Sequence, residues 1–313
     1  AETIDPQQSY AVSKRRVAEL LQEAVALHLV SDVPVGAFLS GGIDSSALAA
    51  LMRVAGQQPH TFSVVFNEEE FDEAQYARLV ARAVRAEHTE LRLGQGELLD
   101  ALPASIQAMD QPTGDGINSY VVSQAVRNAG VKVALSGLGG DEFFGGYPAF
   151  SRLGKAGRYL RLWGNLPGLL RAQFSHAAKY FSGPSIAADK TAAMLASDGQ
   201  LASVYPLMWQ VLSPEQRRTL LTDRVLKQVQ IQSDPYHSLL QTAFAGKSAG
   251  LISQISYAEA RTYMHDVLLR DTDQMSMAHA LEVRVPLLDH KLAELAMSIP
   301  PSWKMRNGNW QTY

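Results

Sequence analysis

The chain has 313 residues, a net charge of −3 at pH 7, 46% hydrophobic residues and no cysteine. These values fit one large globular domain or two of ordinary size, and they exclude a disulfide framework, a thiol nucleophile and a broad basic surface for nucleic acid. No apolar run approaches the roughly 20 residues that span a bilayer, and no secretory signal opens the chain. We therefore expect a cytoplasmic protein with neither nucleic acid nor a membrane among its partners.

Helical and strand patterns alternate along the first part of the chain. Apolar residues at helical spacing predict helices, and short β-branched or aromatic runs predict strands. In chain order they predict a helix over 13–30, a strand over 33–38, a helix from 47 to 52, a strand over 61–66, a helix over 72–86, a strand over 88–93, helices over 97–109 and 119–128, and a strand over 131–135. This alternation predicts an α/β fold with a doubly wound parallel sheet, helices on both faces and right-handed crossovers.

The second half of the chain has a different pattern. From residue 151 onward, helical spacing is interrupted by glycine and proline, and no convincing series of strands follows. We expect an α/β core over 1–150 and a helical portion over 151–313. The first residue is not Met and the last three carry no stop signal, so we expect this sequence to be part of a longer protein.

Residues 39–46 (LSGGIDSS) join the first predicted strand to the helix that follows it. Backbone N–H groups converge at such a turn, the helix N-terminus is partly positive, and glycine leaves room for a close approach. Ser40, Ser45 and Ser46 add hydroxyl donors, so we expect the loop to bind phosphate. Asp44 is a carboxylate inside this anion site, which a divalent cation between it and the phosphates would explain.

A second glycine-rich loop, residues 136–147 (SGLGGDEFFGGY), follows the predicted strand over 131–135. Ligands of open α/β sheets bind at the carboxyl ends of the strands, so both loops are expected to face one crevice. Asp44 and Asp141 would then share one Mg²⁺ on a polyphosphate. Either loop alone is as often only a tight turn, and neither matches the dinucleotide-binding or Walker A pattern. Two loops with one acid each favour a polyphosphate site.

Residues 40–46 resemble the PP-loop of N-type ATP pyrophosphatases, and the flanking residues 33–39 and 47–52 resemble those of asparagine synthetases and their amidotransferase relatives. Three further segments agree with this resemblance, which covers nearly the whole chain: 71–74 (FDEA), 136–147 and 276–289 (SMAHALEVRVPLLD). It implies an adenine nucleotide α-hydrolase-like fold and a synthetase domain. In such a domain ATP activates a carboxylate, aspartate or a relative, as an acyl-adenylate with release of pyrophosphate, and ammonia then forms the amide.

The resemblance implies a role for each matching residue. Asp44, Asp141 and Glu142 would be catalytic, and the two aspartates would bind Mg²⁺. Pyrophosphate would be held by the residues of the first loop, Ser40, Gly41, Gly42, Asp44, Ser45 and Ser46. The AMP portion of ATP would be lined by Leu39, Val64, Ser136 and Gly137. Preorganised N–H donors and Mg²⁺ suit this division, because negative charge grows on the departing pyrophosphate.

The sequence departs from the family in three respects. Leu138 stands where asparagine synthetases usually have a glutamate that faces the acyl-adenylate, so either Glu142 or Glu282 compensates or the acceptor is not aspartate. Full-length relatives hydrolyse glutamine with an N-terminal cysteine, and this chain has none, so we expect ammonia from solution or from a glutaminase domain or subunit. The family's Arg-x-Lys stretch lies beyond Tyr313, and we expect truncation at this end.

Three functions remain open at this point. The first is an asparagine-synthetase-like ligase that forms AMP and pyrophosphate. The second is a related adenylating ligase with another acceptor, through intramolecular cyclisation or amidation of a peptide or polysaccharide. The third is a catalytically silent nucleotide-binding domain. A homodimer is also left open.

Four more residues are candidates for the substrate cleft: Asp115, Asp271, Glu282 and Arg284. Arg284 could clamp a carboxylate or phosphate with two hydrogen bonds, although a structural pair with Glu282 explains it equally well. Asp115 also suits a turn or a helix N-cap. Asp271 lies in a charged stretch that is also typical of a solvated helix face.

Overall fold

The computed structural model describes residues 9–66, 74–183, 185–229, 235–245, 250–306 and 309–310. Two compact units make up the chain. The sheet unit contains the described residues up to 146 together with 263–304, and the helical unit contains 147–262 and 305–310. Residues 263–304, which the sequence analysis assigned to the helical portion, therefore belong to the unit that carries the sheet.

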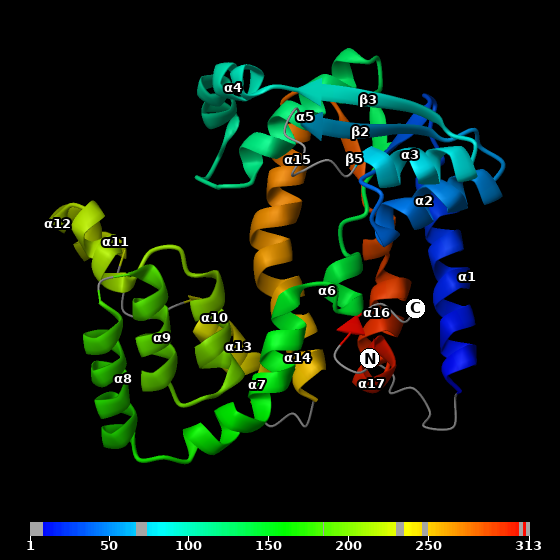
Figure 1. Cartoon of the computed structure of the whole chain (residues 1–313). Helices are drawn as coiled ribbons and strands as arrows, with labels where there is room; N and C mark the ends of the chain where they lie inside the picture. The colour runs from blue at the N-terminus through cyan, green and yellow to red at the C-terminus, as the bar shows by residue number, and fades with distance from the viewer. Residues whose placement is uncertain are drawn as a thin grey trace. The chain divides into compact units, whose positions relative to one another are not determined.

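Five parallel strands form the sheet in the order β3-β2-β1-β4-β5, which confirms the predicted α/β fold (Figure 1). Their bounds are β1 Val35–Phe38, β2 His60–Phe66, β3 Glu87–Leu93, β4 Val133–Leu135 and β5 Glu282–Arg284. On the central strand Ala37 pairs with Thr61 on one side and Leu135 on the other, and Leu135 in turn pairs with Arg284. Because every pair is parallel, β1, β2 and β4 end at the same edge of the sheet.

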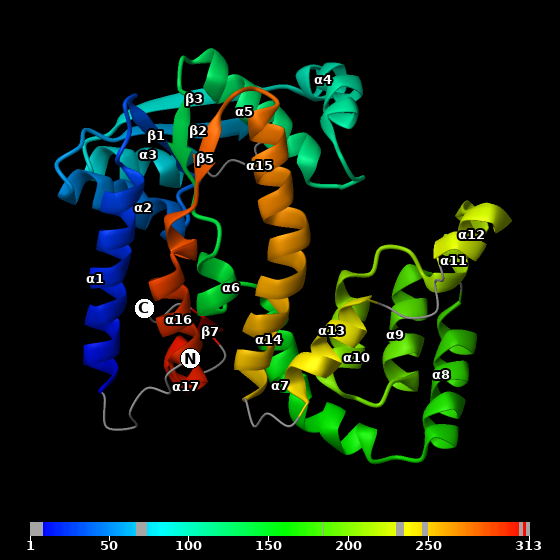
Figure 2. The same ribbon diagram turned by 180° about the vertical axis from the view of Figure 1, so that it is seen from behind.

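Helices cover both faces of this sheet (Figures 1 and 2). Leu135 packs with α1 and α2 on one face, and its neighbour Ala134 packs with α5 on the other, as the alternation of side chains along a strand requires. The helices of the unit are α1 Tyr10–His28, α2 Ile43–Val54, α3 Ala74–Ala83, α4 Gln95–Ala108, α5 Gly116–Asn128, α6 Gly140–Phe144, α15 Arg270–Met277, η3 Pro286–Leu288, α16 His290–Ser298 and α17 Pro301–Lys304.

The predicted elements of the first part are present within a few residues of their expected bounds. The first residues of the helix expected over 72–86, and Phe71, Asp72 and Glu73 of the family segment, lie outside the described residues. The sequence analysis missed β5, because its three residues, Glu282–Arg284, include only one apolar side chain, whereas β4 lies within an apolar run.

The helical unit contains α7 Pro148–Gly164, α8 Gly168–Ser182, α9 Ile186–Ala196, α10 Leu201–Trp209, α11 Pro214–Leu220, α12 Asp223–Val229, α13 Pro235–Phe244, α14 Leu251–Glu259 and the short hairpin β6 Met305–Arg306 and β7 Asn309–Trp310. Phe150, Tyr205, Leu240 and Ile255 are fully buried at its core. A π-helix, η2 over Ala260–Leu269, connects α14 to α15. Among the described residues, no helix combines the length and the apolar character that crossing a membrane requires.

Candidate functional site

The loop between β1 and α2 is held by its own serines. The Ser40 N–H donates to Ser45 Oγ at 3.2 Å, and the two hydroxyl oxygens are 3.1 Å apart. The Ser46 hydroxyl donates to the Gly42 carbonyl at 2.6 Å. These bonds fix the turn at the N-terminus of α2, where the partial positive charge of a helix end favours an anion.

Gly41 is required for this turn to form. Its φ angle is +81°, which an L side chain rarely adopts, and a Cβ atom would lie 2.6 Å from Tyr76 Cβ and 2.8 Å from Ala77 N. The first turn of α3 therefore lies directly against the loop. Any larger residue at position 41 would have to displace it.

The second loop turns sharply after β4. Gly139 has a φ angle of +102°, and α6 begins at the next residue, so Asp141 and Glu142 lie in its first turn. The N–H groups of Gly145 and Gly146 both donate to the Asp141 carbonyl, at 2.9 and 2.8 Å. The loop thus closes around the backbone of the aspartate that the sequence analysis singled out.

The two loops are in direct contact at Asp44. A Cβ atom at Gly137 would lie 3.1 Å from both Asp44 Cβ and Ser45 N, and one at Gly140 would collide with the Asp44 carboxylate. Glycine at these two positions therefore lets the second loop approach the first. The fold brings together the two glycine-rich segments that were selected from the sequence, with Asp44 at their contact.

The electrostatics of this contact are unfavourable to negative charge. Burial, followed by the charges of Asp141 and Glu142, raises the pKa of Asp44 from 3.8 to about 7. Burial also raises the pKa of Asp141. Within the described part of the chain, neither aspartate carboxylate forms an ion pair or accepts a hydrogen bond. Among the described residues, the Asp44 and Asp141 carboxylates therefore have no ion-pair partner.

A divalent cation fits this donor set. Carboxylate oxygens are preferred ligands of Mg²⁺, which usually keeps only one or two protein carboxylates and completes its shell with phosphate oxygens and water. The described residues contain no cluster of three or more His, Cys, Asp or Glu suited to hold a metal. Asp44 and Asp141 therefore suit a cation that arrives with a polyphosphate better than one held by the protein alone.

The residues expected to line the AMP portion of ATP differ in how deeply they are buried. Leu39 is buried among Ala49, Ala77 and Ala81, so its side chain faces the core. Its N–H donates to the Phe62 carbonyl at 2.8 Å, which supports a role in positioning the loop. The other three, Val64, Ser136 and Gly137, are partly buried near the ends of β2 and β4.

Leu138 and Glu142 occupy different environments within the second loop. Leu138 is partly buried, whereas Glu142 is buried and close enough to Asp44 to raise its pKa. Leu138 has no group that transfers a proton. Of the two residues that could compensate for it, Glu142 lies at the contact of the loops, and Glu282 is exposed on β5.

Asp115 and Asp271 anchor the segment before α5 to the long helical stretch that ends in α15. Asp115 is exposed and accepts a hydrogen bond from the Tyr263 hydroxyl at 2.9 Å. Asp271 is buried and accepts from the Thr113 hydroxyl and, at 3.1 Å, from Arg270 Nη2. Asp271 is therefore not part of a solvated helix face.

The Arg284 guanidinium forms hydrogen bonds with other residues of the chain. Its Nη1 donates to the His28 carbonyl at 2.6 Å and to the Val30 carbonyl at 2.8 Å, and its Nε donates to Glu282 at 2.7 Å. The guanidinium thus binds the last carbonyl of α1 and a carbonyl just beyond the helix, and it pairs with Glu282 of its own strand. These contacts favour the structural pair over the substrate clamp.

Two features had no signal in the sequence. Arg270 donates to Gln111 at 2.6 Å, a contact between residues that no local pattern connects. Lys304 at the end of α17 is buried, and burial lowers its pKa to about 8. A buried lysine of lowered pKa is a common type of functional residue.

The chain is similar to known proteins over nearly its whole length. The family model for asparagine synthase matches residues 16–311. Asparagine synthetase [glutamine-hydrolyzing] 1 of Bacillus subtilis is 30% identical over 300 residues, covering 94% of this chain and 45% of the relative. A putative asparagine synthetase [glutamine-hydrolyzing] of Mycobacterium tuberculosis is 31% identical over 295 residues, covering 92% and 43%.

A third relative has a different name: amidase chry2 of Gibberella zeae is 28% identical over 328 residues, covering 93% of this chain and 46% of the relative. This chain therefore spans less than half the length of the curated relatives it matches. The match of the family model to nearly all of its residues and the meeting of its two glycine-rich loops lead to one conclusion. The chain belongs to the asparagine synthase family.

Proposed function

We propose that this chain is an ATP-dependent synthetase domain that joins nitrogen to a carboxylate. The carboxylate attacks the α-phosphorus of ATP, giving an acyl-adenylate and pyrophosphate, and ammonia then displaces AMP to leave an amide. The observation that carries the proposal is the contact of the two glycine-rich loops at Asp44, where the charges of neighbouring carboxylates add to burial in raising the pKa of Asp44. Family membership supports ATP as the substrate.

The first loop is proposed to hold the departing pyrophosphate. Its backbone is fixed by the bonds among Ser40, Ser45 and Ser46, so N–H groups at the start of α2 are oriented before the ligand arrives. Such preorganised donors stabilise charge where it develops in the transition state. Glycine at position 41 keeps that loop close against α3.

Asp44 and Asp141 are proposed to hold Mg²⁺ together with the phosphates. When bound, the cation would neutralise the two carboxylates and polarise the phosphate oxygens. The raised pKa of Asp44 supports this role, because the ionised carboxylate is unfavourable until a positive charge accompanies it.

Ammonia is proposed to come from a glutaminase domain or subunit. The names of two relatives include glutamine hydrolysis, and this chain has no cysteine to serve as a thiol nucleophile. The chain alone is then expected to use free ammonium and to ignore glutamine. Amide formation from glutamine by the chain alone would contradict this part of the proposal.

The test is a reaction with ATP, Mg²⁺, ammonium and a panel of carboxylates. We expect AMP and pyrophosphate in equal amounts, dependent on one carboxylate, with no ADP. Asp44→Asn is expected to abolish the reaction, while Asp100→Asn, at an exposed position on α4, is the matched control and leaves it unchanged.

Leu138 favours a second candidate, in which the acceptor is a carboxylate other than aspartate. A partly buried leucine cannot pair with ammonia or an ammonium group, and it suits a more apolar acceptor. The same panel separates the two candidates. Turnover of a larger or cyclising carboxylate at rates above those with aspartate supports the second, and turnover of aspartate at ordinary rates counts against it.

A further inference from the structure

The helix α8 places its large apolar side chains in solvent. Leu169, Tyr180 and Phe181 are 82%, 84% and 85% exposed, and Leu170 and Phe174 are also exposed. No residue of this 15-residue helix is buried. Leu170, Phe174 and Phe181 follow one another at spacings of four and seven, so they share one face of the helix. We call the face formed by these five side chains the outer face of α8.

The outer face is not the result of a helix that has failed to pack. α8 lies beside α9 in both views (Figures 1 and 2), and the Ser175 hydroxyl donates to the Ala192 carbonyl of α9 at 2.8 Å. The residues that alternate with the outer face, Ala172, Ser175 and Ala178, are small and partly buried. Small residues thus face the protein and large apolar residues face solvent, which reverses the usual pattern of a surface helix.

The surrounding sequence carries positive charge only. Between Glu142 and Asp189 there is no acidic residue and there are six Lys or Arg, in a chain whose net charge is −3. On α7 an exposed stripe at helical spacing combines two cations with two large apolar residues: Arg152, Lys155, Tyr159 and Leu162. Interleaved cationic, aromatic and aliphatic side chains are typical of helices that lie on a membrane surface.

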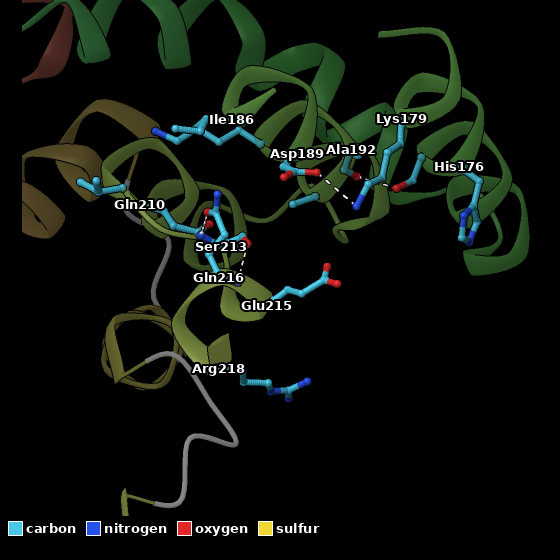
Figure 3. Close-up of a pocket in the computed structure, with 14 residues that line it drawn as sticks. His176, Lys179, Ile186, Asp189, Ala192, Gln210, Ser213, Glu215, Gln216 and Arg218 are labelled. Carbon is cyan, nitrogen blue, oxygen red and sulfur yellow. Dashed lines mark hydrogen bonds and ion pairs between the residues drawn. The ribbon is translucent and has the colours of Figure 1, made fainter. Parts of the chain in front are cut away.

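A cavity of about 510 Å³ lies on the other side of α8, where Ser175 faces α9. Lys179 of α8 and Arg218 of α11 line it (Figure 3), together with Lys190 of α9. Asp189, 3.2 Å from Lys179, and Glu215 are the acids on its wall. The outer face instead adjoins α7, because the Phe174 ring contacts Trp163 with ring centroids 5.5 Å apart.

We propose that the outer face of α8 and the cationic stripe of α7 dock this protein on an anionic lipid bilayer. An anionic bilayer has a hydrocarbon interior beneath negatively charged headgroups. The large apolar side chains of α8 suit the interior, and the cations of α7 suit the headgroups. A second copy of the chain is a poor occupant, because pairing two such surfaces brings like charges together. This proposal departs from the expectation that no membrane is among the partners, which rested on the lack of a long apolar run; a helix on the membrane surface needs no such run. The proposal is independent of the synthetase activity.

The test is sedimentation of the chain with vesicles of equimolar phosphatidylglycerol and phosphatidylcholine, beside vesicles of phosphatidylcholine alone. We expect binding to the anionic vesicles that weakens with added salt. Tyr180→Ser with Phe181→Ser is expected to lower partitioning by roughly tenfold or more, from the apolar surface lost. Leu99→Ser is the matched control, since Leu99 is 66% exposed on α4 of the sheet unit.

A labelled variant reports insertion directly. Because the chain has no cysteine, Phe181→Cys carries a single polarity-sensitive dye, and its emission is expected to shift to the blue on anionic vesicles, unlike the dye of Leu99→Cys. Circular dichroism checks that each variant is folded. Equal binding of the serine variant and the parent, no blue shift, or a salt-independent preference for neutral vesicles would overturn the proposal. Binding to single-stranded DNA without binding to vesicles, or loss of self-association in the serine variant, would assign the surface to another partner.

Discussion

Asp44→Asn removes a carboxylate whose ionised form is unfavourable in the ligand-free fold. Burial and the charges of Asp141 and Glu142 raise its pKa from 3.8 to about 7. The folded chain therefore holds this proton more tightly than the unfolded chain, and the stability it confers below about pH 4 is lost as the pH rises towards 7. At about 1.4 kcal/mol per pKa unit the cost reaches about 4 kcal/mol, and relaxation of the site reduces it to about 2 kcal/mol.

The asparagine side chain has nearly the same shape as that of aspartate but carries no charge. At about pH 8 the Asp44→Asn variant without ligands is expected to unfold in urea with a free energy about 2 kcal/mol above that of the parent, and the difference should vanish near pH 4. Mg²⁺ with ATP is expected to stabilise the parent and to leave the variant unchanged, because binding to the folded state alone raises stability. Asp100→Asn is the control for the loss of an exposed carboxylate.

Two results would refute this reasoning. A variant that is less stable than the parent at both pH values would show that the Asp44 carboxylate contributes favourable contacts in the ligand-free fold. A variant that Mg²⁺ and ATP stabilise as much as the parent would remove Asp44 from the binding site, whatever its effect on stability.

Three further substitutions test the roles of single contacts. Gly140→Ala is expected to abolish stabilisation by ATP and to lower the free energy of unfolding by about 1–3 kcal/mol, because the methyl group collides with Asp44, while Gly96→Ala, with open space at that atom, has neither effect. Arg284→Ala is expected to lower the Tm by removing donors to the carbonyls of His28 and Val30 at the end of α1, and a raised KM for the carboxylate at an unchanged Tm would instead indicate a substrate clamp. Asp271→Asn weakens a buried acceptor with two donors and is expected to cost about 1–3 kcal/mol in urea unfolding; an unchanged value would contradict the anchoring role.

The sheet and the meeting of its two loops were predictable because both are encoded locally. Alternating strand and helix patterns predict that the strands run parallel. The loops after parallel strands then lie at one edge of the sheet. Glycine at 41, 137 and 140 is required by contacts that the structure then shows, so the glycine pattern itself carried the information. Asp44 and Asp141 followed from their positions in the glycine-rich segments after β1 and β4, where α2 and α6 begin.

Contacts over long sequence separations could not be predicted in the same way. Arg284 binds the carbonyl of His28, 256 positions away, and Asp271 binds Thr113, 158 positions away. The spacing of apolar residues predicts which face of a helix or strand is apolar. It does not predict which distant part of the chain that helix or strand contacts. α8 shows the converse case, because its apolar residues predict a buried face and the structure places that face in solvent.

The nucleotide product tests the central claim most directly. With ATP, Mg²⁺, ammonium and the carboxylate that is turned over, the account predicts AMP and pyrophosphate in equal amounts, resolved by phosphorus NMR, and their loss in Asp44→Asn. ADP and inorganic phosphate as the products would contradict it, because the loops at Asp44 would then not be holding a departing pyrophosphate.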